Sequence, residues 1–422
     1  MKNNRKGFTI VELVIVIAVI AILAAVLIPT FVSLNKKAKI AADTQLAKNL
    51  NTALTMADAE NKVDSFDEVL AALREAGYII ANINPTTESW YYVWESESNQ
   101  ILLVDETFAV KYNSKEFSKT TVGSTWNFVV SSKAKEAALV AALPEGHGAN
   151  IVVAIGSVAD LKDAIAAGGE IFVDESVVLD KDNLLLFDQG KDIIVNLGNS
   201  QLTSDGTLDG IKPIQIQAGN KVTINGGIVG AEGSGVDLDG NTYSTPIQDY
   251  PSSTTVINGT QFNITGGGVQ FQGTANLNNV TANTYIYCFG NGKVTLDNCV
   301  VTKSNDNAIW VTNTIVHEGA PSTYDGTSTL TIKSGKYTGY NTGTGVVGVY
   351  GGTIKIEGGD FFGQTGKNMF YVGHAAGKII LSGNCTFNGD TLTKLGKEGI
   401  EGICCGNYKV VEDNGTYTIT LK

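Results

Sequence analysis

Residues 293–301 read KVTLDNCVV, an alternating apolar run, a polar corner and a second short apolar run. Similar stretches recur in the C-terminal part of the chain: KVTINGGIV from Lys221, TTVINGTQF from Thr254, ANLNNVTAN from Ala275, TLTIKSGKY from Thr329, TIKIEGGDF from Thr353 and KIILSGNCT from Lys378. In each, a run in which apolar and polar residues alternate, as is typical of a strand, leads to a corner rich in Gly and Asn. Repetition of one such unit predicts a stack of strands in which each copy packs on its neighbours.

One apolar residue anchors each repeat. These anchors are Ile224, Ile257, Leu277, Leu296, Ile332, Ile356 and Leu381, spaced 33, 20, 19, 36, 24 and 25 residues apart. The two long gaps contain polar insertions at residues 233–253 and 313–328. A coil of about 20–25 residues with Gly/Asn corners resembles a turn of a right-handed parallel β-helix. We expect this all-β solenoid over residues 150–390; a β-sandwich is the alternative.

Both ends of the expected solenoid carry capping signals. Ser157 and Asp160 predict a short helix that ends at Gly168 and closes the first coil. Asn414-Gly415, flanked by two β-rich runs, predicts a hairpin within a C-terminal β cap over residues 391–422.

Composition divides the chain near residue 150. Of the 48 glycines among its 422 residues, only five precede that point. The chain has 30 Lys and Arg against 42 Asp and Glu, a net charge of −12 that argues against nucleic-acid binding. Its only arginines are Arg5 and Arg74, and its three histidines are far apart. We therefore expect no metal site and no cofactor.

The N-terminus contains a membrane-spanning signal. Residues 13–35 carry no charge, and as a helix they reach about 35 Å, enough for a hydrocarbon core of about 30 Å. Lys2, Arg5 and Lys6 precede the run, which orients the N-terminus toward the cytoplasm. A secretory signal peptide is disfavoured because the run is too long and Glu12 stands at its head.

The helix is expected to continue beyond the apolar run. Leu46, Leu50, Leu54 and Ala57 recur at helical spacing. Other positions of the helix are charged: Lys36, Lys37, Lys39, Asp43 and Lys48. We expect one helix over residues 8–62, kinked at Pro29 because proline removes a backbone hydrogen bond.

The segment Gly7-Phe8-Thr9-Ile10-Val11-Glu12-Leu13 with the helix behind it resembles the processing signature of type IV pilins and pseudopilins. The resemblance implies a leader over residues 1–7, removed by prepilin peptidase between Gly7 and Phe8, and methylation of Phe8. It also implies assembly with other pilin subunits, first in the cytoplasmic (inner) membrane and then in a surface pilus. Glu12 would pair with the new N-terminal ammonium of a neighbouring subunit.

Residues 63–112 predict a small α/β head. Ser65 and Glu68 form a capping-box pattern that opens a short helix, and residues 90–104 read as a β-hairpin. Trp90 and Trp94 share one strand face, which we expect to pack on the long helix. Residues 113–149 are expected to connect this α+β part to the solenoid.

The five cysteines lie in the Gly-rich part without C-x-x-C spacing. An exported domain favours disulfides, so we expect Cys385 to pair with Cys404 or Cys405 and clamp the last coil to the cap. Cys288 and Cys299 are expected to be buried as small hydrophobes.

Parallel β-helices resemble polysaccharide lyases and hydrolases, so catalysis is an alternative. No arginine follows residue 74, and Asp237 and Asp239 form the best acidic cluster, too little for a convergent acid and base. Aromatic residues crowd the final repeats, where they serve either the core or sugar binding: Tyr337, Tyr340, Tyr350, Phe361, Phe362, Phe370 and Tyr371.

We therefore expect no enzyme. The sequence predicts a type IV pilin-like filament subunit with an extracytoplasmic β-helix that adheres to a surface glycan or host ligand. The alternatives are a pseudopilin of a type II-like secretion system and a cell-surface polysaccharide lyase or hydrolase.

Overall fold

The computed structural model describes residues 10–422 apart from short gaps. The gaps are residues 61, 79, 97, 113–124, 131–132, 144, 146–147, 181, 205–212, 232–234, 237–241, 244–246, 265–267, 305, 318–319, 324–325, 341–343 and 364–368. The leader, the Gly7–Phe8 bond and the Asp237–Asp239 cluster therefore lie outside the described residues. The chain forms two compact units, an N-terminal unit (Met1–Val130 with Ala138–Val152) and a C-terminal unit (Ser131–Ala137 with Val153–Lys422).

The N-terminal unit consists of a long helix and a small head. Its helices are α1 (Ile10–Glu60) and α2 (Phe66–Glu75), followed by a 3-10 turn at Ile80–Asn82. Its strands are β1 (Tyr91–Glu95), β2 (Gln100–Val104), β3 (Val110–Tyr112) and β4 (Thr125–Val130). The next elements, α3 (Lys133–Ala142) and β5 (Gly148–Ile155), are each divided between the two units. Antiparallel pairing gives the order β4-β1-β2-β3 and confirms the expected hairpin of β1 and β2.

The head buries an aromatic and aliphatic core. The α2 side chains Phe66, Val69, Leu70 and Leu73 are buried, and the Phe66 ring stacks on Trp94 with centroids 5.8 Å apart. Trp94 is 5% exposed and its indole N–H donates to Asn99 Oδ1. The Trp94 face of the hairpin is thus packed against α2.

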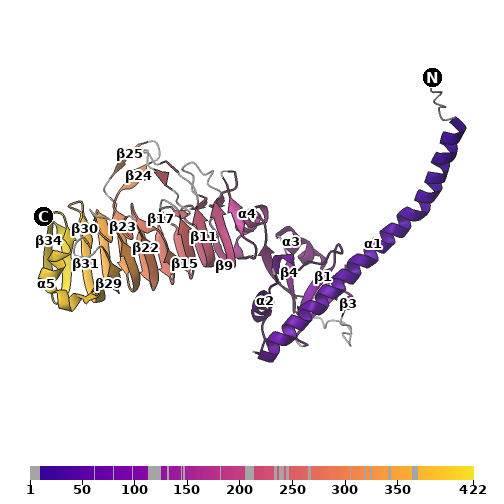
Figure 1. The fold of residues 1–422 in the computed structure, drawn as a ribbon, viewed down its shortest axis with the longest axis horizontal. Coiled ribbons are helices and arrows are strands. Elements are labelled where there is room, and N and C mark those ends of the chain that lie inside the picture. Colours follow the sequence, from indigo (N-terminus) through magenta and orange to yellow (C-terminus); the bar gives the residue numbers. More distant parts are fainter. Residues whose placement is uncertain are drawn as a thin grey trace, which may run out of the picture. The chain divides into compact units, whose positions relative to one another are not determined.

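The C-terminal unit begins with α4 (Val158–Ala167), capped by Ser157 and ended by Gly168 at φ 80°, as expected. In Figure 1 the strands after α4 lie one after another along the unit. A first series is parallel: β6 (Gly169–Val173), β9 (Asp192–Ser204), β11 (Lys221–Ala231), β15 (Thr254–Asn258), β18 (Thr274–Asn278), β21 (Lys293–Asp297), β26 (Thr329–Ile332), β29 (Gly352–Phe362) and β31 (Gly377–Phe387).

A second parallel sheet alternates with the first along the chain. In order it contains β8 (Leu185–Phe187), β10 (Ile214–Ile216), β14 (Ile247–Asp249), β17 (Gly268–Phe271), β20 (Tyr285–Cys288), β23 (Ile309–Thr312), β28 (Val347–Tyr350), β30 (Phe370–Val372) and β33 (Cys404–Cys405). The other described strands are β7 (Val177–Leu179), β12 (Gly235–Val236), β13 (Thr242–Tyr243), β16 (Gln261–Ile264), β19 (Thr281–Ala282), β22 (Cys299–Lys303), β24 (Ile315–His317), β25 (Ala320–Thr323), β27 (Gly335–Gly339) and β32 (Asp390–Thr391). The strands of both series pair in parallel, whereas the sheets of a β-sandwich are antiparallel, so the structure does not match the β-sandwich alternative.

All seven expected anchors are aligned in the first sheet. Ile224 pairs with Ile257, and the register continues through Leu277, Leu296, Ile332, Ile356 and Leu381. Each anchor is at most 1% exposed. Val195 and Ile171 extend the column by two passes that precede the repeats recognised in the sequence.

Polar side chains add a second column beside the anchors. Asn278 Nδ2 donates to Asn258 Oδ1 (2.9 Å), Asn258 to Asn225 (2.8 Å) and Asn225 to Asn196 (2.8 Å). The next position turns the corner in the left-handed region, as Asn279 does at φ 55°. The Asn-rich corners of the sequence therefore join successive passes by side-chain hydrogen bonds.

The C-terminal end is covered as expected. The hairpin of β34 (Tyr408–Asp413) and β35 (Thr416–Leu421) follows α5 (Leu392–Gly402). Strand β35 pairs antiparallel with β31, so the last parallel strand of the first sheet does not present a bare edge.

The expected clamp between Cys385 and Cys404 or Cys405 is not formed, and all three residues carry free thiols. Cys385 lies in the first sheet and donates to Ser382 O, whereas Cys404 lies in the second sheet and donates to Ile400 O. Burial raises the pKa of each of these two thiols to about 12. Cys288 and Cys299 are fully buried, as expected.

Candidate functional site

The N-terminal part of α1 is an exposed apolar rod. The large apolar side chains described between Ile10 and Leu34 are 48–81% exposed. An 18-residue window of the helix has a mean hydropathy of 3.3 with none of it buried, so its length and composition suffice to cross a membrane. With 51 residues, α1 is about 77 Å long.

Pro29 lies inside α1 without interrupting it. A proline cannot donate the backbone hydrogen bond that Ala25 O would otherwise accept, and this normally bends a helix. In Figure 1 the ribbon of α1 curves in its N-terminal half.

Glu12 lies in the first turn of α1 and is the one charged residue of the sequence between residues 8 and 35. A carboxylate at this end of a helix interacts favourably with the helix dipole. Gly7 and Phe8, the predicted cleavage and methylation residues, lie outside the described residues. Of the predicted processing and assembly residues the structure therefore places only Glu12.

The C-terminal part of α1 is joined to the head by Asp43, which is 2% exposed. Its Oδ1 accepts hydrogen bonds from Thr86 N (2.7 Å) and Thr86 Oγ1 (2.9 Å). Its Oδ2 accepts from Thr87 N (3.0 Å) and Thr87 Oγ1 (2.6 Å). The Tyr92 hydroxyl donates to Asp43 O, and burial together with the Asp43 charge raises the pKa of Tyr92.

Asn51 makes a second link, two turns further along α1. Its Nδ2 donates to Ile101 O (2.7 Å) and its Oδ1 accepts from Ile101 N (2.9 Å), so the amide satisfies both backbone groups of one residue of β2. Leu50 and Leu54 are buried beside it, at 0% and 1% exposure. The head is therefore held on α1 by directional polar bonds as well as apolar contact.

The buried stripe of α1 differs from the one expected. Leu50 and Leu54 are core residues, but Leu46 and Ala57 are only half-buried, and Asp43 and Ala47 continue the stripe instead. Asp43, which the sequence groups with the charged residues of this helix and not with its apolar stripe, is itself buried.

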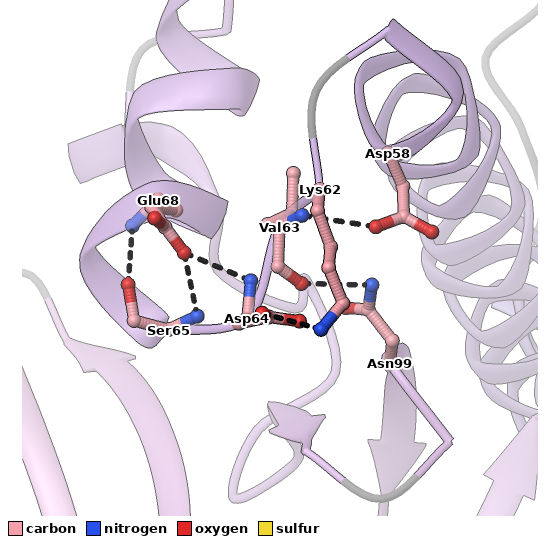
Figure 2. A network of polar contacts seen from close by, with 7 residues as sticks. All are labelled: Asp58, Lys62, Val63, Asp64, Ser65, Glu68 and Asn99. Carbon is pink, nitrogen blue, oxygen red and sulfur yellow. Dashed lines mark hydrogen bonds and ion pairs between the residues drawn. The ribbon is translucent and has the colours of Figure 1, made fainter.

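The turn between α1 and α2 is closed by the network shown in Figure 2. Glu68 accepts from the backbone N–H groups of Asp64 and Ser65 at 2.8 Å, and Ser65 Oγ accepts from Glu68 N, which confirms the capping box. The bonds from Asp64 N and the Ser65 hydroxyl lower the pKa of Glu68. Asn99 Nδ2 donates to Val63 O, which connects this turn to the β1–β2 hairpin.

A carboxylate also organises the loop between β2 and β3. Asp105 Oδ1 accepts from Thr107 N, Thr107 Oγ1 and Ala109 N, and its Oδ2 pairs with Lys111 Nζ at 2.6 Å. Burial alone would raise the pKa of Asp105, but the Lys111 bond and the Thr107 bonds outweigh it and hold that pKa at about 2.

The described part of the chain holds no group of three or more His, Cys, Asp or Glu residues that could bind a metal ion. Among the aromatic residues of the final repeats, Tyr337, Phe361 and Phe370 are fully buried. Tyr340 and Tyr350 are 40% and 39% exposed.

Comparisons with known proteins agree with the N-terminal features. Residues 2–28 match the family model of the prokaryotic N-terminal methylation motif. The chain is 55% identical over 52 residues to the type IV wide pilus major component PilA4 of Thermus thermophilus, an overlap of 12% of this chain and 37% of that protein. It is 30% identical over 127 residues to a fimbrial protein of Moraxella nonliquefaciens, covering 27% of this chain and 81% of that protein. No solved structure matches the chain with statistical significance.

Proposed function

The chain belongs to the type IV pilin family, and we propose that it is a processed subunit of a surface filament that displays its C-terminal unit for adhesion. The observation that carries this proposal is the division of α1. Its exposed apolar part suits first a membrane and then the packed helices of a filament, while Asp43 and Asn51 bind its other part to the head.

Processing is the first step of the proposal. Prepilin peptidase cuts between Gly7 and Phe8 and methylates the new N-terminus at Phe8. The match of residues 2–28 to the methylation-motif model supports this step. Before cleavage the chain spans the cytoplasmic membrane by α1, and after assembly its C-terminal unit is extracytoplasmic.

Glu12 directs assembly in this proposal. A carboxylate within an apolar segment is costly in a membrane, and an ionic partner lowers that cost. The Phe8 ammonium of a neighbouring subunit supplies such a partner after cleavage. Pairing of the two groups would set the axial register of subunits.

The C-terminal unit is proposed to be a right-handed parallel β-helix over residues 150–390 with a β cap over residues 391–422. Two parallel sheets visited in turn and the aligned anchors support it. We propose that this unit binds rather than catalyses, because the chain has no arginine beyond Arg74. The names of both relatives refer to pili or fimbriae, which favours a pilus over a secretion pseudopilus.

The test compares Glu12→Ala and Glu12→Asp in cells that lack the native gene. The Ala variant should enter the membrane at the wild-type level, because an apolar segment gains by losing a carboxylate, but surface filaments should be lost or reduced at least tenfold. The Asp variant should retain filaments. Electron microscopy with antibodies against the C-terminal unit measures both, and wild-type filament numbers in the Ala variant would contradict the pairing role.

A further inference from the structure

The outer face of the second sheet carries a row of neutral residues at equivalent register positions. In register order the row contains Leu186, Gln215, Gln270, Tyr287, Trp310, Gly348 and Tyr371. The adjacent positions Ile286, Ile309 and Val347 are fully buried, so the row points away from the core. Tyr287, Trp310 and Tyr371 are partly exposed.

Two rings of the row are arranged in parallel. The ring centroids of Trp310 and Tyr371 are 6.3 Å apart and their planes differ by 10°. Gly348 separates these two residues in the register, and a Cβ there would lie 2.1 Å from Cζ3 of Trp310. The indole therefore extends over the bare backbone of Gly348, and a Cβ at this position would force the indole to move.

A second glycine makes room for one more ring beside Tyr371. A Cβ on Gly373 would lie 2.4 Å from Cδ2 of Tyr350 and 2.6 Å from Cε1 of Tyr371. Tyr350 is 39% exposed, and its ring centroid is 6.0 Å from that of His374. The two glycines thus allow one continuous aromatic surface made by Trp310, Tyr371 and Tyr350. This surface and the neighbouring Tyr287 are here called the aromatic row.

The chemistry of the aromatic row selects one kind of partner. Pyranose rings present faces of C–H groups that pack on aromatic rings, while their hydroxyls take hydrogen bonds from amides and ring edges such as Gln270 and the Trp310 N–H. None of the register positions named above carries a charge, and the chain as a whole is acidic, which disfavours nucleic acids and polyanions. From Tyr287 to Tyr371 the row spans three strand spacings, about 14 Å.

We propose that the aromatic row is a binding surface for a neutral glycan chain that lies across strands β20 to β30. This inference rests on the proposed function in that it names what the displayed unit binds. The glycan contacts Tyr287, Trp310 and Tyr371 in turn, with Tyr350 at its edge.

The test uses the full chain purified in detergent, titrated with cellohexaose, maltohexaose and hexa-N-acetylchitohexaose and followed by isothermal calorimetry. At least one of the three should bind, and Trp310→Ala and Tyr371→Ala should each weaken that binding at least tenfold. Trp310→Phe should retain part of it. Tyr340→Ala is the control, because Tyr340 is an exposed tyrosine (40%, against 39% for Tyr350) that lies outside the row, and it should leave binding unchanged.

A further variant keeps every ring. Gly348→Ala introduces a methyl group into the space of the Trp310 indole, so it should weaken glycan binding at least tenfold with the circular dichroism spectrum retained. Binding of none of the three glycans, or equal binding by wild type and Trp310→Ala, would overturn the inference. The inference would also be overturned if Trp310→Ala lost self-association but bound glycan normally, because the aromatic row would then be a contact between copies of this chain.

Filament assembly separates this inference from the proposed function. Trp310→Ala should form filaments at the wild-type level, whereas purified Glu12→Ala chains should bind the glycan normally. A wild-type chain that binds the glycan but is never found in filaments would overturn the filament role alone.

Discussion

Asp43→Ala tests the link between α1 and the head most severely. The variant removes the acceptor of four hydrogen bonds, two from backbone N–H groups and two from the hydroxyls of Thr86 and Thr87. Asp43 is 2% exposed and Thr87 is 7% exposed, so water does not replace the carboxylate without a rearrangement.

The expected loss follows from these four donors. The hydroxyls can rotate to other acceptors, but the N–H groups of Thr86 and Thr87 remain directed at the missing carboxylate. A hydrogen bond to a charged group contributes about 1.5–3 kcal/mol, so losing two of them costs about 4 kcal/mol. Asp43→Asn should cost about 2 kcal/mol, because its amide oxygen serves one threonine while its NH₂ group meets the N–H donor of the other.

The assay is urea unfolding of the full chain in detergent, followed by tryptophan fluorescence. A Trp310→Phe background restricts the signal to Trp90, Trp94 and Trp126 of the N-terminal unit. With a slope of about 2 kcal/mol per molar, Asp43→Ala should lower the unfolding midpoint of this unit by about 2 M. Asp67→Ala, which removes an exposed carboxylate from α2, is the control, with an expected cost of about 0.5 kcal/mol. Equal midpoints for Asp43→Ala and Asp67→Ala would refute the reasoning.

Two further predictions concern single side chains. The pKa of Asp105 is lowered from 3.8 to about 2 in the folded chain, so its ionised form stabilises the fold above pH 4 and this contribution is lost as the pH falls through 2. Asp105→Asn should therefore cost about 1 kcal/mol at pH 7 and only a small part of that at pH 2. Denaturation at both pH values measures the cost, and a cost that does not change with pH would contradict this. Leu296→Ala, in the anchor column between Leu277 and Ile332, should destabilise the C-terminal unit by about 3 kcal/mol, against less than 0.5 kcal/mol for the outward-facing Thr295→Ala in the same strand, with thermal unfolding as the measurement.

The repeats could be predicted from the sequence because each buries one residue at the same place. Alternation in KVTLD identifies Leu296 as inward-facing, and strand pairing then requires the equivalent residue of the next pass beside it. The insertion before Thr329 did not obscure this, since it lies between strands and leaves the register unchanged. The first two passes were missed because their strands are followed by polar runs that hide the spacing of Ile171 and Val195.

Partners that meet only in three dimensions could not be predicted in this way. Asp43 looks like any charged residue on an exposed helix face until Thr86 and Thr87 are brought to it by the turn after α2. Cys385 and Cys404 are close in sequence but belong to different sheets. Trp310 and Tyr371 meet across Gly348 only because β23, β28 and β30 are adjacent in the second sheet.

The central claim is that this chain is processed and incorporated as a filament subunit. Mass spectrometry of the chain recovered from filaments sheared off the cell surface tests it most directly. The proposal predicts a chain that begins at N-methylated Phe8 and lacks residues 1–7. Three results would contradict it: filament subunits that retain the leader and begin at Met1, filament subunits with an unmethylated internal N-terminus, or filaments that lack this chain.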